Sequence, residues 1–208
     1  VDQDGSVWTR LDGGLYKIDC GGGGQLEASP GAPFLDLGAG TYVSDFLVSE
    51  SSVWIATENG LYRLHRGTGE WKRYLANPAD PRSLTQNFVS SLARTHDGLL
   101  LASTLHGLNV YNPVADNFER VGTDIINCIK TSGDKLLIAT ENRGFRLAVP
   151  KTLFVTNVSN MPGDGSSLAA GAVNAIWQEP DGRLWVGSVE GGLSVRDPGS
   201  EAFRHLTR

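Results

Sequence analysis

The sequence predicts an all-β fold assembled from a repeated four-stranded antiparallel unit, and three features lead to this prediction. A Gly-Leu or Gly-Phe pair recurs five times, at 14–15, 60–61, 107–108, 144–145 and 192–193. The spacings between the second residues of these pairs are 46, 47, 37 and 48 residues. A short apolar run precedes each pair, and in most copies an Asp-Gly or Gly-Asp turn precedes that run, as is typical of consecutive hairpins.

Each copy is expected to hold four strands in a fixed order. The first strand carries apolar residues three positions apart, with small or polar residues between them: Val43/Phe46, Val89/Leu92, Ile126/Ile129 and Val173/Ile176. The second strand starts at a large apolar residue and ends in small or hydroxyl residues: 54–57, 101–104, 137–140 and 185–188. The Gly-Leu pair opens the third strand. A fourth strand closes the unit at 70–74, 117–121 and 202–206, with weaker outer strands at 34–37 and 153–155.

Four short antiparallel strands in about 45 residues are typical of one blade of a β-propeller. We expect five repeats, at approximately 1–42, 43–87, 88–124, 125–171 and 172–208. Copy one lacks its first strand, and propellers usually have four to eight blades, so we expect part of a larger propeller of about seven blades. A closed five-bladed ring is the alternative. Trp8, Trp54 and Trp185 occupy the same strand position and are expected to pack between blades.

Composition excludes several function classes. The net charge of −5, the pI near 5.3 and the scattered lysines argue against nucleic-acid binding. No apolar run is long enough to cross a membrane, so membrane attachment would come through a span outside this segment. Cys20 and Cys128 lie three copies apart and are expected to be unpaired.

No catalytic or metal-binding constellation is apparent. The four histidines fall at different repeat positions and lack the spacing of metal ligands: His65, His96, His106 and His205. We therefore expect no catalytic residue, no metal, no cofactor and no enzyme activity in this segment.

The turns between second and third strands are the candidate ligand site. These turns share one face with the connections between blades, and their residues differ from copy to copy, whereas the Asp-Gly turns of the opposite face mostly repeat. Varied polar side chains on one rim suit a small polar ligand. The alternative is that these residues are polar because turns are solvated. The candidate ligand-binding residues are Arg10, Asp12, Glu58, Asn59, His106, Glu141, Asn142, Arg143 and Glu190.

Two stretches resemble the two-component regulator propeller repeat. One contains Tyr74, Asn77-Pro78, Asp80-Pro81, Ser83-Leu84, Asn87, Val89, Asp97-Gly98 and Gly107-Leu108. The other runs from Asp181-Gly182-Arg183-Leu184-Trp185-Val186-Gly187-Ser188 to Gly191-Gly192-Leu193. Copies three and four depart from the repeat, with Leu101 and Leu137 in place of the usual Trp.

The resemblance implies a periplasmic sensor region of a bacterial hybrid two-component system. Such regions are large propeller arrays, followed by an immunoglobulin-like domain, a membrane span and a cytoplasmic kinase or regulator. The resemblance also implies a homodimer in the full-length protein, and ligands that are often oligosaccharides from polysaccharide breakdown.

Two other function classes remain open. A propeller lyase similar to those acting on streptogramins would need a His base near a carboxylate-held metal, and His106 with Glu141 or Glu190 is the candidate set. A structural module would instead hold a partner protein on an exposed apolar face.

Overall fold

The computed structural model describes residues 7–11, 14–18, 35–38, 40–149 and 154–206. In this part the chain forms nineteen strands in five separate antiparallel sheets, one of three strands and four of four. Each sheet is a run of consecutive strands paired in chain order. This is the predicted all-β architecture, and in the described residues the sheet of copy one has three strands. The described part contains no helix long and apolar enough to cross a membrane.

The five sheets are named blades 1 to 5 in chain order. Blade 1 contains β1 (Val7–Leu11), β2 (Gly14–Ile18) and β3 (Leu35–Asp36). Blade 2 contains β4 (Val43–Val48), β5 (Ser52–Thr57), β6 (Gly60–His65) and β7 (Trp71–Tyr74). Blade 3 contains β8 (Val89–Arg94), β9 (Leu100–Thr104), β10 (Gly107–Asn112) and β11 (Asn117–Val121). Blade 4 contains β12 (Ile126–Ser132), β13 (Lys135–Thr140), β14 (Phe145–Val149) and β15 (Phe154–Val158). Blade 5 contains β16 (Val173–Gln178), β17 (Leu184–Ser188), β18 (Gly192–Arg196) and β19 (Arg204–Leu206).

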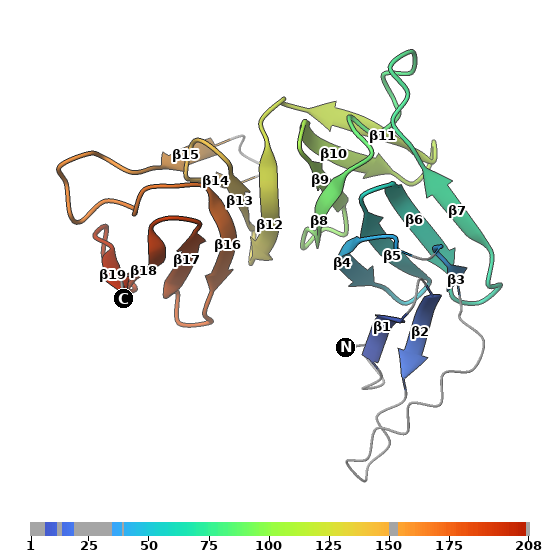
Figure 1. The fold of residues 1–208 in the computed structure, drawn as a ribbon, viewed down its shortest axis with the longest axis horizontal. Helices are drawn as coiled ribbons and strands as arrows, with labels where there is room; N and C mark the ends of the chain where they lie inside the picture. Colours follow the sequence, from blue (N-terminus) through green and yellow to red (C-terminus); the bar gives the residue numbers. More distant parts are fainter. Residues whose placement is uncertain (1–6, 12–13, 19–34, 39, 150–153, 207–208) are drawn as a thin grey trace, which may run out of the picture.

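The blades follow one another along an arc (Figure 1), with blade 1 and blade 5 at its two ends. The first strands of blades 2 to 5 lie on the inside of the arc, and β7, β11, β15 and β19 lie on its outside (Figure 1). Consecutive inner strands contact one another, β4 with β8, β8 with β12, and β12 with β16. The inner strands therefore lie side by side around part of a common axis.

Four apolar clusters lie between the blades and hold them together. A single four-stranded sheet cannot bury both its faces, so each blade covers one face of the next. Within a second strand, successive side chains alternate between the two interfaces. Val53 and Ile55 pack toward blade 1, whereas Trp54 and Ala56 pack toward blade 3.

The three tryptophans do not share one environment. Trp8 and Trp54 are buried, with 8% and 3% of their surface exposed, as the sequence predicted. Trp185 is partly exposed, and its Nε1 donates a hydrogen bond to Glu179 Oε1 at 2.7 Å. Leu184 and Val186 pack against blade 4, so Trp185 lies on the opposite face of the sheet, and no further blade follows in the described chain. The sequence predicted that Trp185 packs between two blades; in the described chain it lies instead on the face of blade 5 that no other blade covers.

The repeated glycine at the start of the third strand has a steric cause. Gly107 has a φ of +110°, and a Cβ there would lie 2.3 Å from the carbonyl oxygen of Gly122. At Gly144 a Cβ would lie 2.1 Å from Val158 O. The outer strand ends against this backbone, so no side chain fits there.

The two long crossovers between blades are near-copies of each other. Asp80 and Asp164 each accept a hydrogen bond from the backbone two residues on, and Ser83 and Ser167 each bond the backbone at the start of the loop. Leu84, 0% exposed, then plugs the space between blades 2 and 3, and the equivalent Leu168 plugs blades 4 and 5.

Candidate functional site

A β-bulge interrupts the first strand of every complete blade at the same position. Pairing with the second strand shifts register between Val43 and Asp45, between Val89 and Ser91, and at the equivalent places in β12 and β16. A bulge inserts one residue and redirects its side chain. The inserted residues are Ser44, Ser90, Asn127 and Asn174.

These four residues line one hollow on the axis, which we call the axial cavity. Its volume is about 460 Å³. The other lining residues come from the same inner strands, from the ends of the connections and, for Leu105, from the turn between β9 and β10: Tyr42, Asp45, Phe88, Ser91, Leu105, Cys128 and Lys130. The bulge explains why the hollow is polar, because the apolar neighbours of the inserted residues point into the inter-blade cores.

Two aromatic rings stand on one side of the axial cavity. Tyr42 and Phe88 precede β4 and β8, and their rings are stacked, with centroids 6.4 Å apart and planes 20° from parallel. Tyr42 is 55% exposed. An exposed aromatic face beside hydroxyl and amide groups offers both stacking and hydrogen bonding.

Side chains inside the axial cavity also tie adjacent blades together. Asp45 Oδ2 accepts hydrogen bonds from Ser91 Oγ and Leu92 N, both at 2.9 Å. Ser90 Oγ donates to Ile126 O at 2.6 Å, and Asn127 Nδ2 donates to Val173 O at 3.1 Å. The inner strands of blades 2 to 5 are therefore held side by side, and the cavity walls are positioned before any ligand arrives.

Lys130 and Cys128 are the cationic and the thiol side chain among the lining residues of the axial cavity. Lys130 is exposed and supplies a cation with N–H donors. Burial raises the pKa of the Cys128 thiol, which stays protonated and is no activated nucleophile. Cys128 is a free cysteine, as expected. Cys20 lies outside the described residues.

The predicted rim turns do lie on the face where the blade connections end. Glu58 N donates to Tyr42 O at 3.2 Å, and Glu58 Oε1 accepts from Tyr42 N at 3.1 Å. Glu58 therefore positions an axial-cavity residue. Asn59 is exposed, and its carbonyl accepts from Arg73. His106 is exposed beside Leu105, which lines the cavity.

The structure brings three other predicted residues together. Glu141, Asn142 and Glu190 line a second hollow of about 460 Å³, which we call the blade 4–5 hollow. Glu141 Oε2 accepts a hydrogen bond from Asn127 Nδ2 at 2.9 Å, so this hollow adjoins the axial cavity.

The remaining predicted residues lie apart from both hollows or outside the description. Arg143 points instead to Asp124, 3.6 Å away. Arg10 lies in β1, and Asp12 lies outside the described residues.

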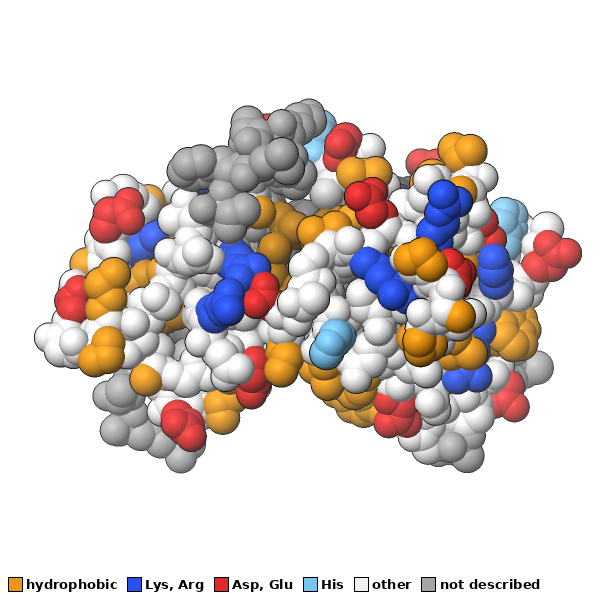
Figure 2. Space-filling view, turned by 90° about the horizontal axis from the view of Figure 1, so that it is seen from above, with side chains coloured by type: hydrophobic (Ala, Val, Ile, Leu, Met, Phe, Trp, Pro, Cys, Tyr) orange, Lys and Arg blue, Asp and Glu red, His pale blue; other side chains and the backbone are white. Residues whose placement is uncertain are grey.

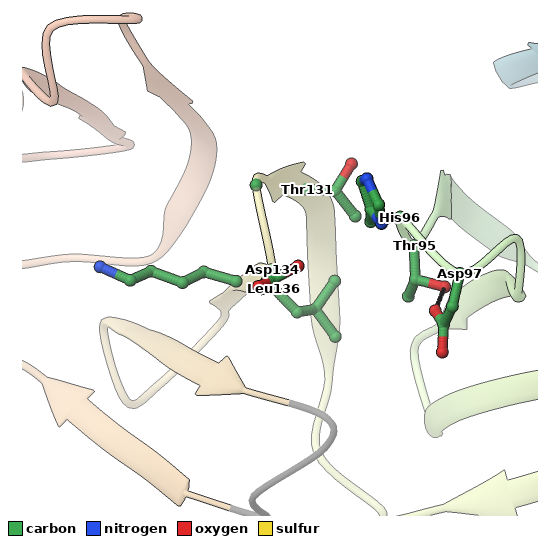
Figure 3. A pocket seen from close by; sticks show the side chains of 8 residues that line it. Thr95, His96, Asp97, Thr131, Asp134 and Leu136 are labelled. Carbon is green, nitrogen blue, oxygen red and sulfur yellow. Dashed lines mark hydrogen bonds between the residues drawn. The ribbon is translucent and has the colours of Figure 1, made fainter.

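The opposite face offers no comparable site at the turns of blades 3 and 4. A hollow there is lined by Thr95, His96, Asp97, Thr131, Asp134 and Leu136 (Figure 3). Its volume of about 20 Å³ is close to that of one water molecule. Among the described residues no group of three or more His, Cys, Asp and Glu could hold a metal. Basic and acidic side chains are interspersed on the face shown in Figure 2, without a continuous basic stripe.

Sequence reasoning missed the bulge residues and the aromatic pair. The signal was present, because Val43 and Phe46 are three apart yet pack in the same cluster. A regular strand would place residues three apart on opposite faces, so this spacing requires an inserted residue. Polar residues inside that spacing therefore mark the axial cavity.

Comparison with known proteins supports the fold. No protein-family model matches the chain, and no curated protein matches it. Among solved structures, the extracellular domain of BT4673 from B. thetaiotaomicron, described as a one-component system, has a TM-score of 0.76 and 17% identity. The alignment covers 100% of this chain and 27% of that chain.

Two further solved structures are similar. The extracellular domain of BT3049 from the same organism, described as a hybrid two-component system, has a TM-score of 0.71 and 20% identity over 98% of this chain and 28% of that chain. The WD40 repeats of RRP9 have a TM-score of 0.60 and 12% identity over 81% of this chain and 52% of that chain. The chain thus spans less than a third of the two extracellular domains. It is a run of β-propeller blades, built like those of the bacterial extracellular domains to which it is similar.

Proposed function

We propose that the chain is part of the extracellular sensor region of a bacterial two-component signalling protein, and that its axial cavity binds an oligosaccharide or a similar hydroxyl-rich ligand. The fold shared with extracellular domains of such systems supports the sensor class. The periplasmic location, the membrane span, the kinase and the dimer contacts belong to the same proposal and would lie outside this segment.

The observation that carries the ligand class is the composition of the axial cavity. An exposed Tyr42 stacked on Phe88 stands beside the hydroxyl and amide groups of Ser90, Asn127 and Asn174. Sugars present apolar ring faces and hydroxyl groups that both donate and accept hydrogen bonds. The cavity matches both features. The proposal includes no catalytic step.

Calorimetry with a panel of neutral oligosaccharides tests the proposal. Tyr42→Ala should weaken binding about tenfold, because an aromatic contact contributes about 0.5–1.5 kcal/mol beyond its buried area. Tyr42→Phe should retain most of the affinity, because it keeps the stacking face. Asn174→Ala, at an exposed bulge position, should also weaken binding.

Trp71→Ala is the matched control. Trp71 is 54% exposed, like Tyr42, but lies on the outer strand of blade 2. Equal losses in Tyr42→Ala and Trp71→Ala would show unspecific aromatic contact. Absence of heat with every member of the panel would refute the proposal.

A further inference from the structure

The blade 4–5 hollow results from side-chain truncation at one end of a repeated loop. Between the buried Leu84 and Val89, the blade 2–3 crossover contains Thr85-Gln86-Asn87-Phe88. Between the equivalent Leu168 and Val173, the blade 4–5 crossover contains Ala169-Ala170-Gly171-Ala172. All four small residues line the hollow.

In the blade 2–3 crossover the larger side chains are engaged with the protein. Thr85 Oγ1 lies 2.8 Å from Thr104 Oγ1, and Asn87 Oδ1 accepts from Ala76 N at 2.7 Å. The side-chain oxygen of Gln86 is buried and accepts no hydrogen bond, so Gln86 takes up space there without being bonded through this atom. In the blade 4–5 crossover, alanine and glycine replace these side chains, and Gly171 has a φ of +100° that Asn87 does not share, so the space is left open to a ligand.

The wall of the hollow is sterically fixed. A Cβ on Gly191 would lie 2.4 Å from Ala170 O and 2.6 Å from Ala169 Cβ, so the 189–192 turn rests directly on the crossover. Val189 N donates to Ala172 O at 3.0 Å, which holds the same contact. The hollow is therefore a preformed feature of the fold.

The polar side chains of the hollow are carboxylates, amides and the hydroxyl of Ser159. Glu141 and Glu190 line it together with Asn142 and Asn160, and no Lys or Arg is among its described lining residues. The neighbouring cation, Arg143, pairs with Asp124 at 3.6 Å on the side of blade 3. Two carboxylates without a cation in the same hollow favour a positively charged donor and repel an anion.

From this we infer that the blade 4–5 hollow is a subsite for a sugar unit that carries a protonated amine. A primary ammonium presents three N–H donors, which the carboxylates and amide oxygens of the hollow can accept. The hydrogen bond between Asn127 and Glu141 joins the subsite to the axial cavity, so one oligosaccharide can reach both. The inference rests on the proposed saccharide binding and adds the charge of one unit.

Three tetrasaccharides serve as probes in calorimetry with the purified protein. They are the tetramers of glucosamine, of N-acetylglucosamine and of galacturonic acid. At about pH 5 an amino-sugar amine is largely protonated, because this pH lies below its pKa even though the neighbouring oxygens lower that pKa from the ordinary amine value. The glucosamine tetramer should bind about fivefold tighter than its acetylated counterpart, the scale expected for a partly exposed charge pair. The galacturonate tetramer should bind most weakly.

Two variants test whether the preference for the glucosamine tetramer depends on the blade 4–5 hollow. Glu190→Gln should bring the glucosamine and N-acetylglucosamine affinities within about twofold of each other. Ala170→Gln copies Gln86 of the other crossover and should remove the preference by filling the hollow. Glu119→Gln makes the same charge change at an exposed site on β11 and should leave the preference intact.

The outcomes separate this inference from the proposed function. Equal affinity for the amine and acetylated tetramers, tightest binding of galacturonate, or a preference that survives Glu190→Gln would overturn the amine subsite. Binding that Tyr42→Ala still weakens would then leave the proposed function standing. Absence of binding by all three tetramers would also overturn the amine subsite, whereas only absence of heat with the whole panel of neutral oligosaccharides would overturn the proposed function.

Discussion

Arg120 is expected to be the most important single side chain for the blade 2–3 crossover. Its Nε donates to Ser83 O at 3.0 Å. Its Nη2 lies 2.8 to 3.2 Å from Ser83 Oγ and from the carbonyl oxygens of Asn77, Asp80 and Leu84. One guanidinium thus contacts four backbone carbonyl oxygens of the loop that ends at the buried Leu84.

Arg120→Ala should lower the free energy of unfolding by about 2–3 kcal/mol. Hydrogen bonds to charged groups contribute about 1.5–3 kcal/mol each, but Arg120 is half-buried, so water replaces part of the loss. In a chain of this size 1 kcal/mol corresponds to about 2–4 °C, so Tm should fall by about 5–10 °C. Arg120→Lys should recover only a small part, because an ammonium cannot present the planar fork of donors.

Blade 5 allows the opposite test, in which an arginine is introduced at the position equivalent to Arg120. His205 pairs with Ser194 as Arg120 pairs with Asn109, and the 161–168 loop repeats the hydrogen bonds of the 77–84 loop. His205→Arg should therefore raise the free energy of unfolding by about 1 kcal/mol. Arg94→Ala, an exposed arginine on β8, is the control and should change Tm by less than about 2 °C. A loss below about 0.5 kcal/mol in Arg120→Ala, measured by urea unfolding, would refute the reasoning.

Three further predictions concern stability. Burial alone would raise the pKa of Asp116, but hydrogen bonds from Lys72, Tyr111 and Tyr74 outweigh it and hold the pKa at about 2. Because the folded pKa is depressed, wild type should lose stability relative to Asp116→Asn as pH falls from about 4 to about 2, and parallel acid unfolding curves would contradict this. Gly107→Ala should cost at least about 2 kcal/mol more than Gly98→Ala, because both have positive φ but only Gly107 faces backbone within 3 Å; equal Tm values would exclude the clash. Trp54→Ala should cost about 3–5 kcal/mol and Trp185→Ala distinctly less, as thermal unfolding can show, because only Trp54 is enclosed by a following blade.

Local sequence patterns predicted the blades because each blade is a local structure. Turn glycines and alternating apolar residues define hairpins between consecutive strands, and 117–121 is β11 in the structure as predicted. The environment of Trp185 could not be predicted in this way, since it depends on whether another blade covers that sheet.

The candidate site was predicted less well than the fold because it depends on contacts between repeats. Glu141, Asn142 and Glu190 do meet in one hollow, but the hollow forms because residues 169–172 have small side chains or none. No single polar residue in the sequence indicates such a hollow. The axial cavity depends on the bulges. Their sequence signal, apolar residues three apart, becomes clear only when both residues are known to share one cluster.

The repeat architecture separates the positions that stabilise the fold from those that can change ligand specificity. Leu84 and Leu168 recur because each fills the space beneath a long crossover, and Gly107 and Gly144 recur because the outer strand of the same blade ends against their backbone. The residues before the first strands vary instead, from Tyr42 and Phe88 to Ile125 and Ala172. These positions lie at the ends of connections, and Tyr42 and Ile125 are exposed, so their substitution costs little packing energy. Since the bulge residues of four blades meet at one axis, a change in any one blade alters the same surface, which we propose binds the ligand. A propeller of this kind can therefore acquire a new ligand by substitutions that leave its inter-blade cores untouched.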